Sequence, residues 1–389
     1  MKKKRIAFVV TSFQVGGVER ALLTLLDQID RRYYDVTVFL PDASGAWTEK
    51  LQEKEKVVIL RNDTIRQTLC WELRHLRLFS ALRSLFYRRR SRKVGAKDYH
   101  ESYELFIRSM RRYPKRFDLA AAYQIVNDDC VLACLYRIRA QKRIAWSHAT
   151  IRKENPIYTR WYDQFDKIFC VSEYARRALL DNMPALQEKV SVYYNHLEPE
   201  RLRQLALDFA PPAPPPGSFV VTTVGRLSPE KGQLLIPKAA RLLCDSGLSL
   251  LWYVIGDGAS REELASLIRQ EGVEDRVLLL GNLENPYPYM RLCDVYVQTS
   301  LTEGWGLTVS EAKALGKAIV TTDAGVMAEQ IRSGRNGLIV PEATSEALAE
   351  GIRSIADHPE LKTRFTAALA EEDLSNAGEI QKLYALIDG

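Results

Sequence analysis

The sequence predicts an α/β protein with two doubly wound, Rossmann-like domains that face a common cleft. Short apolar segments such as Ile6–Val10 and Phe219–Val224 alternate with segments of helical periodicity. This alternation is typical of parallel sheets covered by helices on both faces. The 389 residues exceed the size at which one core stops growing. A proline-rich segment, 211–217, divides the alternating pattern into two halves, because it cannot enter a helix or a central strand.

The domain boundaries are predicted from this division. We expect an N-terminal domain at 1–205, a linker at 206–217, a C-terminal domain at 218–370, and a helical segment at 371–389 that packs back on the N-terminal domain. Further strands of the two sheets are expected at 36–40, 57–60, 119–123, 143–146, 168–171, 250–255, 277–280, 295–298, 318–321 and 337–340. The carboxyl ends of such strands are where doubly wound sheets bind ligands.

Composition restricts the cellular compartment that the sequence predicts. The six cysteines are scattered, and no two pairs have zinc-finger spacing, which argues against a structural zinc site and suits a reducing cytosol. The apolar run after the basic N-terminus is too short for a signal peptide. No stretch of about 18 apolar residues occurs, so we expect a cytoplasmic protein that does not span a membrane.

Residues 302–312 give the strongest indication of chemistry. Glu303 and Glu311 flank Gly304 and Gly306, which are expected to form a tight turn before a helix. Glycines let backbone N–H groups approach a ligand, and a helix N-terminus favours an anion such as a diphosphate. A carboxylate in the helix can accept both hydrogen bonds of a ribose diol, and one before the turn can hold sugar hydroxyls. A surface turn with an exposed glutamate is the alternative, which the whole cluster disfavours.

A second candidate lies at Gly225–Gly232, directly after a predicted strand. Arg226 and Lys231 would stand at the carboxyl edge of the sheet, where they can neutralise the charge that grows on a leaving diphosphate. Two solvated charges in a surface loop are the alternative. Pro237 falls within the helix expected after Lys231, where it should remove a hydrogen bond and kink the axis.

These motifs resemble the family 4 retaining glycosyltransferases, or glycosyl transferases group 1, which have the GT-B fold. Their Gly-Arg loop with a following lysine and their Glu-x7-Glu around a Gly-aromatic-Gly turn both occur here, with tryptophan in place of the commoner phenylalanine. In such enzymes the arginine and lysine hold the diphosphate, the first glutamate holds the donor sugar and the second holds the ribose. The resemblance implies catalytic roles for Arg226, Lys231 and Glu303, and a donor site that also includes Gly225, Gly256, Gly258, Gly304, Trp305, Gly306, Leu307, Thr308 and Glu311.

The N-terminal half resembles the family more loosely. Gly16 and Gly17 match the glycine loop that faces the donor phosphate and the acceptor, although a Gly-Gly pair is more often only a turn. Asn195 matches the segment that closes the first domain. His148 falls where many relatives carry a cleft histidine, which would hydrogen-bond a sugar hydroxyl or the developing charge. His75 and His196 are expected to be structural.

The resemblance implies metal-independent hexosyl transfer, without a cofactor, from a nucleotide-sugar donor, most commonly a UDP-sugar. The acceptor would be a glycan or lipid-linked molecule in cell-surface polysaccharide or glycolipid synthesis, and attack would come from the front face. Two alternatives stay open. A nucleotide-sugar epimerase on the same fold would release product without an acceptor, and a non-catalytic partner subunit would keep the fold with a decayed site.

Residues 61–116 form a basic insertion. They include 16 lysines and arginines against five acidic residues, a net charge of +11, whereas the whole chain carries +6. Leu69, Leu73, Leu76, Phe79, Leu82 and Phe86 recur at helical spacing, which predicts one basic amphipathic helix. Such a helix suits an anionic membrane surface at the cytoplasmic face. A helix packed on its own domain is the alternative, and nucleic acid is not expected because no recognised binding module is present.

Overall fold

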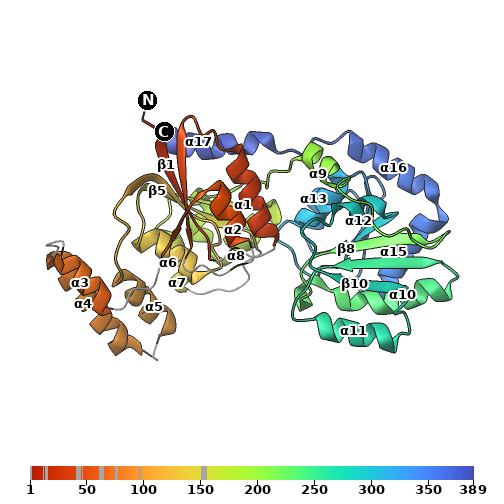
Figure 1. The fold of residues 1–389 in the computed structure, drawn as a ribbon, viewed down its shortest axis with the longest axis horizontal. Coiled ribbons are helices and arrows are strands. Elements are labelled where there is room, and N and C mark those ends of the chain that lie inside the picture. Colours follow the sequence, from red (N-terminus) through yellow and green to blue (C-terminus); the bar gives the residue numbers. More distant parts are fainter. Residues whose placement is uncertain are drawn as a thin grey trace.

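The computed structural model of the chain describes residues 2–11, 13, 16–40, 45, 47–60, 65–74, 78–95, 98–149 and 156–389. It contains a seven-stranded sheet in the N-terminal half and a six-stranded sheet in the C-terminal half. Helices cover both faces of each sheet, and the two halves lie side by side along the longest axis of the molecule (Figure 1). The prediction of two doubly wound α/β domains is therefore confirmed.

The N-terminal sheet is parallel and has the strand order β3-β2-β1-β4-β5-β6-β7. The order reverses between β1 and β4, and in sheets of this kind ligands bind beside the carboxyl ends of the strands at that point. Its strands are β1 Lys4–Val9, β2 Tyr34–Leu40, β3 Lys56–Ile59, β4 Arg116–Ala122, β5 Arg139–Ser147, β6 Lys167–Cys170 and β7 Val190–Val192.

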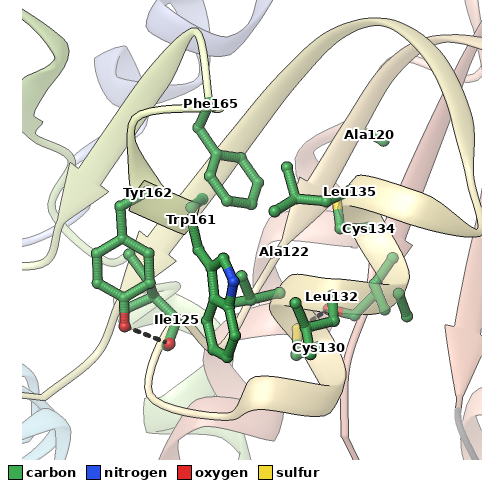
Figure 2. Packing of buried hydrophobic residues seen from close by; sticks show 14 of the residues in the cluster. Ala120, Ala122, Ile125, Cys130, Leu132, Cys134, Leu135, Trp161, Tyr162 and Phe165 are labelled. Carbon is green, nitrogen blue, oxygen red and sulfur yellow. Dashed lines mark hydrogen bonds between the residues drawn. The ribbon is translucent and has the colours of Figure 1, made fainter. Parts of the chain in front are cut away.

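Helices cover both faces of this sheet. The helices in this half of the chain are α1 Gly17–Gln28, α2 Thr48–Lys54, α3 Ile65–Arg74, α4 Leu78–Val94, α5 Tyr99–Arg108, α6 Asp128–Tyr136, α7 Pro156–Tyr162 and α8 Glu173–Asn182, of which α3 and α4 project away from the sheet (Figure 1). On one face, Trp161 and Phe165 pack with the apolar side of α6 against the alanines of β4 (Figure 2). The Tyr162 hydroxyl in this core donates a hydrogen bond to the Ile125 carbonyl at 2.9 Å, so its polar atom is satisfied.

The C-terminal sheet repeats the same topology. Its strand order is β10-β9-β8-β11-β12-β13, with the reversal between β8 and β11. The strands are β8 Phe219–Val224, β9 Leu250–Ile255, β10 Val277–Gly281, β11 Val295–Gln298, β12 Ala318–Thr322 and β13 Leu338–Val340. The helices in this half of the chain are α9 Pro199–Leu205, α10 Ile236–Asp245, α11 Arg261–Gln270, α12 Tyr287–Leu292, α13 Leu307–Ala314, α14 Met327–Gln330, α15 Ser345–Asp357, α16 Pro359–Ala370 and α17 Ile380–Asp388, the last of which packs on the N-terminal domain.

Two segments pass between the domains. Helix α9 precedes the proline-rich segment, and its buried Leu202 packs in the core of the C-terminal domain, although the predicted boundary assigns 199–205 to the N-terminal domain. Helix α17 returns at the end of the chain. Its buried residues Ile380, Leu383 and Ile387 join the core beside β1 and β2 (Figure 1).

Two local expectations are wrong. The helix after Lys231 does not kink at Pro237, because two short 3-10 turns precede it and α10 begins only at Ile236. Pro237 thus lies in the first turn, where a missing N–H costs nothing. The apolar residues expected on one helix of the basic insertion fall on two helices, α3 and α4, and the insertion also contains α5. Residues 75–77, which include His75 and Leu76, lie outside the described residues.

Candidate functional site

The Gly-Trp-Gly turn lies between β11 and α13, at the carboxyl edge of the C-terminal sheet. Gly306 has a φ of +85°, which L side chains rarely adopt, and it directly precedes the first residue of α13, Leu307. No side chain caps α13, so its positive N-terminus is open to an anion. Thr308 donates a hydrogen bond from its hydroxyl to Gln298 Oε1 at 3.1 Å, which ties α13 to the end of β11.

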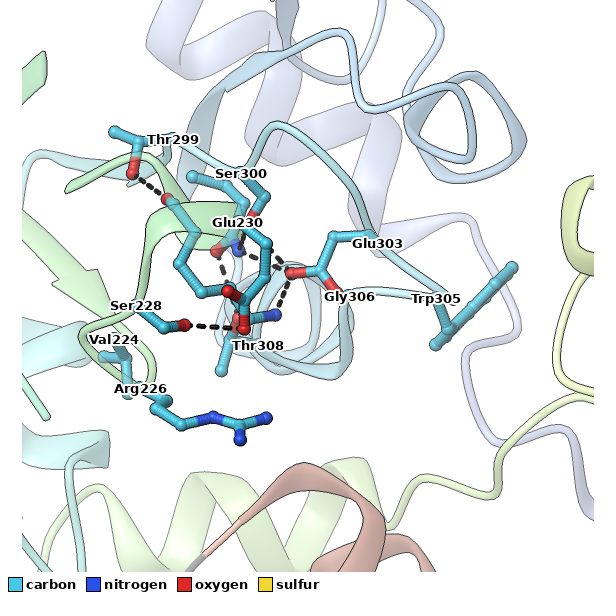
Figure 3. Close-up of polar contacts among 12 residues, drawn as sticks. Val224, Arg226, Ser228, Glu230, Thr299, Ser300, Glu303, Trp305, Gly306 and Thr308 are labelled. Atoms are coloured by element: carbon cyan, nitrogen blue, oxygen red, sulfur yellow. Dashed lines mark hydrogen bonds and ion pairs between the residues drawn. The ribbon is translucent and has the colours of Figure 1, made fainter. Parts of the chain in front are cut away.

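Lys231 and Glu303, predicted from separate motifs, are in direct contact. Lys231 Nζ donates to Glu303 Oε1 at 2.5 Å, and the same oxygen accepts from Gln298 Nε2 at 3.0 Å and Ser300 Oγ at 2.9 Å (Figure 3). The Glu303 side chain is only 8% exposed, and that of Lys231 is 21% exposed. Three donors on one buried carboxylate oxygen hold Glu303 in one orientation. Gln298 and Ser300 carried no signal in the sequence beyond their place after a strand.

Gly232 makes this contact sterically possible. It has a φ of +65°, and a Cβ at this position would lie 2.1 Å from the carbonyl oxygen of Thr299. The Thr299 hydroxyl in turn donates to the Lys231 carbonyl at 2.7 Å. The loop that carries Lys231 therefore lies directly on the segment that carries Glu303, because a glycine stands between them.

Arg226 is exposed, and its guanidinium makes no hydrogen bond or salt bridge to a described residue. In Figure 3 its side chain lies apart from the hydrogen bonds that Glu303 accepts, and no dashed line reaches it. Its loop is positioned by Gly256 and Gly258. A Cβ at Gly256 would lie 1.9 Å from the Gly225 carbonyl oxygen, and one at Gly258 would lie 2.3 Å from that of Leu227. These two glycines thus shape the loop around Arg226.

Glu311 lies in α13 with its side chain 2% exposed. Its Oε1 accepts a hydrogen bond from Arg20 Nη1 at 2.9 Å and one from the Tyr287 hydroxyl at 3.0 Å. Its Oε2 is enclosed and has no partner among the described residues. Sequence reasoning missed this pairing. Arg20 lies three residues after Gly17 of the glycine loop, and nothing in the sequence indicated a role for Arg20 or for Tyr287.

The glycine loop of the N-terminal domain meets α13. Gly17 is the first residue of α1, and a Cβ added to it would lie 3.5 Å from Leu307 Cδ1. Gly16 precedes it in extended backbone, and the Glu19 carboxylate lies beside it, 2.5 Å from where a Cβ of residue 16 would be. The N-termini of α1 and α13 therefore approach each other across the domain boundary. Both favour negative charge.

His148 follows β5 and lies on the same boundary. Its ring packs on Tyr123 with the centroids 4.5 Å apart, and its Nε2 is enclosed without a partner among the described residues. Burial lowers the pKa of His148 to about 3, so the ring is neutral at physiological pH. His148 can therefore donate or accept one hydrogen bond, but it supplies no positive charge. Its carbonyl oxygen faces Gly304, where a Cβ would lie only 2.1 Å away.

Other predicted residues have structural contacts. Trp305 packs against the cores of both domains, lies 5.1 Å from the Tyr194 ring, and points away from Glu303 in Figure 3. His196 is buried and hydrogen-bonded through Nε2 to the Tyr193 hydroxyl at 3.0 Å. The buried Asn195 accepts a hydrogen bond on its backbone carbonyl from Asn376 Nδ2 at 3.0 Å, shortly before α17.

Comparisons with known proteins identify the family of the chain. Residues 15–201 match the profile of Glycosyltransferase Family 4, and residues 206–371 match that of Glycosyl transferases group 1. A Campylobacter jejuni 4-alpha-N-acetylgalactosaminyltransferase acting on a diphospho-undecaprenol is 29% identical over 52% of this chain and 54% of its own length. A lipopolysaccharide core glycosyltransferase of Rhizobium meliloti is 33% identical over 42% of this chain and 47% of its own. The chain thus spans about half the length of the curated relatives it matches.

Solved structures match over nearly the whole chain. HepE of Anabaena in complex with UDP has a TM-score of 0.71 at 19% identity and covers 99% of both chains. HepE with UDP-glucose has a TM-score of 0.69 at 20% identity and covers 98% of this chain and 99% of HepE. These likenesses establish the fold. Together with the two profiles, which span both domains, they show that the chain belongs to the family 4, group 1 glycosyltransferases.

Proposed function

We propose that the chain is a retaining glycosyltransferase that moves a hexosyl group from a UDP-sugar to a glycan or lipid-linked acceptor in cell-surface polysaccharide or glycolipid synthesis. The observation that carries the proposal is the contact of Lys231 with Glu303 beside the uncapped N-terminus of α13. A cation and a helix N-terminus suit a diphosphate, and a fixed carboxylate suits sugar hydroxyls. Supporting the choice of base, HepE was solved with UDP and with UDP-glucose.

The residues divide the work by their chemistry. Lys231 and Arg226 would stabilise the charge that builds on the diphosphate as the bond to the sugar breaks. Glu303 would hold donor sugar hydroxyls, and Glu311 would hold the ribose through Oε2. The neutral His148 would hydrogen-bond a sugar hydroxyl. In front-face attack the acceptor oxygen bonds to the anomeric carbon on the side the diphosphate leaves, and a leaving phosphate oxygen takes the acceptor proton.

A thermal-shift panel tests the donor. UDP, GDP, ADP and UDP-sugars are compared, and the stabilising UDP-sugar is then incubated with extracted membrane lipids for product analysis. We expect UDP and its sugars to raise the melting temperature most, and the sugar to appear on the acceptor with its anomeric configuration retained. Isomerised sugar without an acceptor would indicate an epimerase. No stabilisation by any nucleotide would contradict the proposal.

We further propose that α3 and α4 hold the N-terminal domain on an anionic membrane at its cytoplasmic face. The side chains of Leu73, Leu78, Phe79, Leu82 and Phe86 are exposed, with Phe79 at 91%. Exposed cations accompany them on α4, including Arg89, Arg92 and Lys93. The two helices project from the end of the molecule that lies farthest from the C-terminal domain (Figure 1). Anionic lipid attracts such charges by about 1 kcal/mol each, and apolar side chains add burial at the headgroup boundary.

The contacts of α4 show which of its sides faces its own domain. Ser91 is hydrogen-bonded to the Ser102 carbonyl at 2.9 Å, and Arg88 lies 4.1 Å from the centre of the Phe106 ring, so one side of α4 is occupied by α5. The apolar side chains point elsewhere. Within the described parts of the chain, no helix is both long and apolar enough to cross a bilayer, so attachment would be at the surface.

Co-sedimentation with vesicles tests the membrane proposal. We expect binding to anionic vesicles, partial release in high salt and poor binding to neutral vesicles. Serine at Arg89, Arg92 and Lys93 should weaken the binding and leave UDP affinity unchanged. Serine at Arg269, Arg332 and Arg335 is the matched control, because these exposed cations lie on the C-terminal domain. Equal binding by both triple variants would contradict the proposal.

A further inference from the structure

Arg20, Tyr287 and Glu311 form a closed hydrogen-bonded triangle across the domain boundary. Arg20 Nη1 donates to Glu311 Oε1 at 2.9 Å and to the Tyr287 hydroxyl at 3.0 Å, and that hydroxyl donates to Glu311 Oε1 at 3.0 Å. Arg20 lies in the first turn of α1, in the N-terminal domain. Tyr287 is the first residue of α12 and Glu311 lies within α13, both in the C-terminal domain. The N-terminal domain therefore reaches directly onto the carboxylate that the proposed function assigns to the ribose.

The surroundings favour this arrangement over a solvated ion pair. The Arg20 side chain is 23% exposed and that of Glu311 is 2% exposed. The guanidinium also lies over the Tyr287 ring, 5.5 Å from its centre, and over the Trp47 ring at 5.9 Å. Burial alone would lower the pKa of Arg20, but Glu311 and Tyr287 raise it above its ordinary value. Arg20 is thus a permanent cation in this site.

The two oxygens of Glu311 are in different states. Oε1 accepts from both Arg20 and Tyr287, whereas Oε2 is enclosed and has no partner among the described residues. A buried carboxylate oxygen without a hydrogen bond is unfavourable, so this atom is ready to accept one from a ligand. If Arg20 moved away, Oε1 would lose its charged donor and keep only the Tyr287 hydroxyl.

We propose that Arg20 is a positioning residue for nucleotide recognition. By holding Oε1, it fixes the carboxylate of Glu311 so that Oε2 is presented to the ribose hydroxyls. Recognition of the ribose then depends on the N-terminal domain as well as on the C-terminal domain that carries Glu311. The inference rests on the proposed function, because it assumes that Glu311 binds the ribose.

A purely structural tie between the domains is the competing explanation. Lys50 and Glu284 provide the matched control, since they also form an ion pair between the domains, at 2.8 Å, but both are exposed and neither contacts Glu311. A variant that loses only an ion pair between the domains should lower the affinity for all ligands equally. A variant that loses positioning should weaken the ligand with ribose hydroxyls more than the ligand without them.

The experiment measures UDP and 2′,3′-dideoxy-UDP binding by calorimetry. In the parent, UDP should bind about tenfold or more tightly than the dideoxy form, since hydrogen bonds to a charged group are lost. Arg20→Met should lower this ratio clearly, because only the Tyr287 hydroxyl then holds Oε1, and Arg20→Lys should restore part of it. Lys50→Met should keep the parental ratio. Thermal melts of each variant identify any that fail to fold, in which case Arg20→Lys alone carries the test.

The outcomes distinguish a failure of the ribose role of Glu311 from a failure of the positioning role of Arg20. If Glu311→Ala keeps the parental ratio, the ribose role in the proposed function is wrong. If Glu311→Ala abolishes the ratio but both Arg20 variants keep it, the ribose role stands and the positioning role of Arg20 is overturned. If Lys50→Met reduces the ratio as much as Arg20→Met does, Arg20 acts only as a tie, which also overturns the inference.

Discussion

Replacing Lys231 with alanine removes the cation that contacts Glu303 at 2.5 Å and that we propose to lie beside the leaving diphosphate. The Lys231 side chain is 21% exposed and sits in a partly desolvated site. A unit charge about 5 Å from a phosphate charge, at an effective dielectric constant of about 20, contributes roughly 3 kcal/mol. Losing one donor to a developing anion typically costs a similar amount, about 3 kcal/mol. We therefore expect kcat to fall by roughly a hundredfold.

Affinity for UDP should fall less than kcat, because the charge on the diphosphate grows as the sugar bond breaks. Glu303 keeps Gln298 and Ser300 as donors, so the variant should fold, with a stability loss that a thermal melt will show. The assay is steady-state transfer at saturating UDP-sugar, with UDP affinity from calorimetry and Lys231→Arg as the conservative control. A fall in kcat of less than about tenfold, roughly 1.4 kcal/mol, would refute the role. So would an equal loss of affinity and turnover.

Two further predictions concern pH and metals. Burial lowers the pKa of His148 from 6.5 to about 3, so between these two pH values only the unfolded chain binds a proton at this residue. The free energy of unfolding should therefore be about 2 kcal/mol lower at pH 5 than above pH 7. His148→Phe should flatten the fall in urea-unfolding free energy as the pH decreases from 6.5, and an unchanged slope would contradict the assigned burial. Sugar transfer should persist in EDTA, since Lys231 and Arg226 would neutralise the diphosphate. Loss in EDTA with rescue by Mg²⁺ would show that this reasoning is wrong.

The fold could be predicted because its signal is local. Each buried strand is a short apolar run, such as Phe219–Val224, and the proline-rich segment separates two series of such runs. The Glu303 cluster was also readable, because strand, glycine turn and helix follow one another directly in the chain. The rule that the carboxyl ends of parallel strands meet at one edge placed Lys231 and Glu303 on the same edge of the sheet, but their direct contact was not predicted.

Contacts between distant segments left no such signal. Arg20 and Glu311 are 291 residues apart, and no periodicity in either segment indicates that they meet. Trp305 occupied a motif position, but its ring packs between the domains because apolar surface from both cores is available there. The predicted kink at Pro237 was wrong because the helix was expected to begin directly after Lys231, whereas α10 begins at Ile236. The turns that delay α10 depend on Gly232 and its tight approach to Thr299, which is a tertiary constraint.

The contact between Gly304 and His148 predicts that transfer depends on how closely the domains approach. A Cβ at residue 304 would lie 2.1 Å from the His148 carbonyl oxygen, and both sides are backbone, so no flexible side chain can yield. Gly304→Ala should hold the domains about 1 Å or more apart, given that contacts shorter than about 3 Å are not tolerated between such atoms. The Lys231–Glu303 contact lies wholly in the C-terminal domain and should be kept, so UDP-sugar should still bind, but more weakly, because the Arg20–Glu311 contact across the boundary should be lengthened.

Transfer should nevertheless fall strongly, because the acceptor would lie with the N-terminal domain and a displacement of about 1 Å can cost about a hundredfold in rate. Gly378→Ala is the control, since a Cβ there meets nothing within 4 Å. Small-angle scattering of the UDP complex should give a larger radius of gyration for Gly304→Ala than for the control. Parental transfer by Gly304→Ala would mean that the reaction does not require this closed arrangement. In that case the contacts of Arg20 and His148 across the boundary would belong to a resting state of the enzyme.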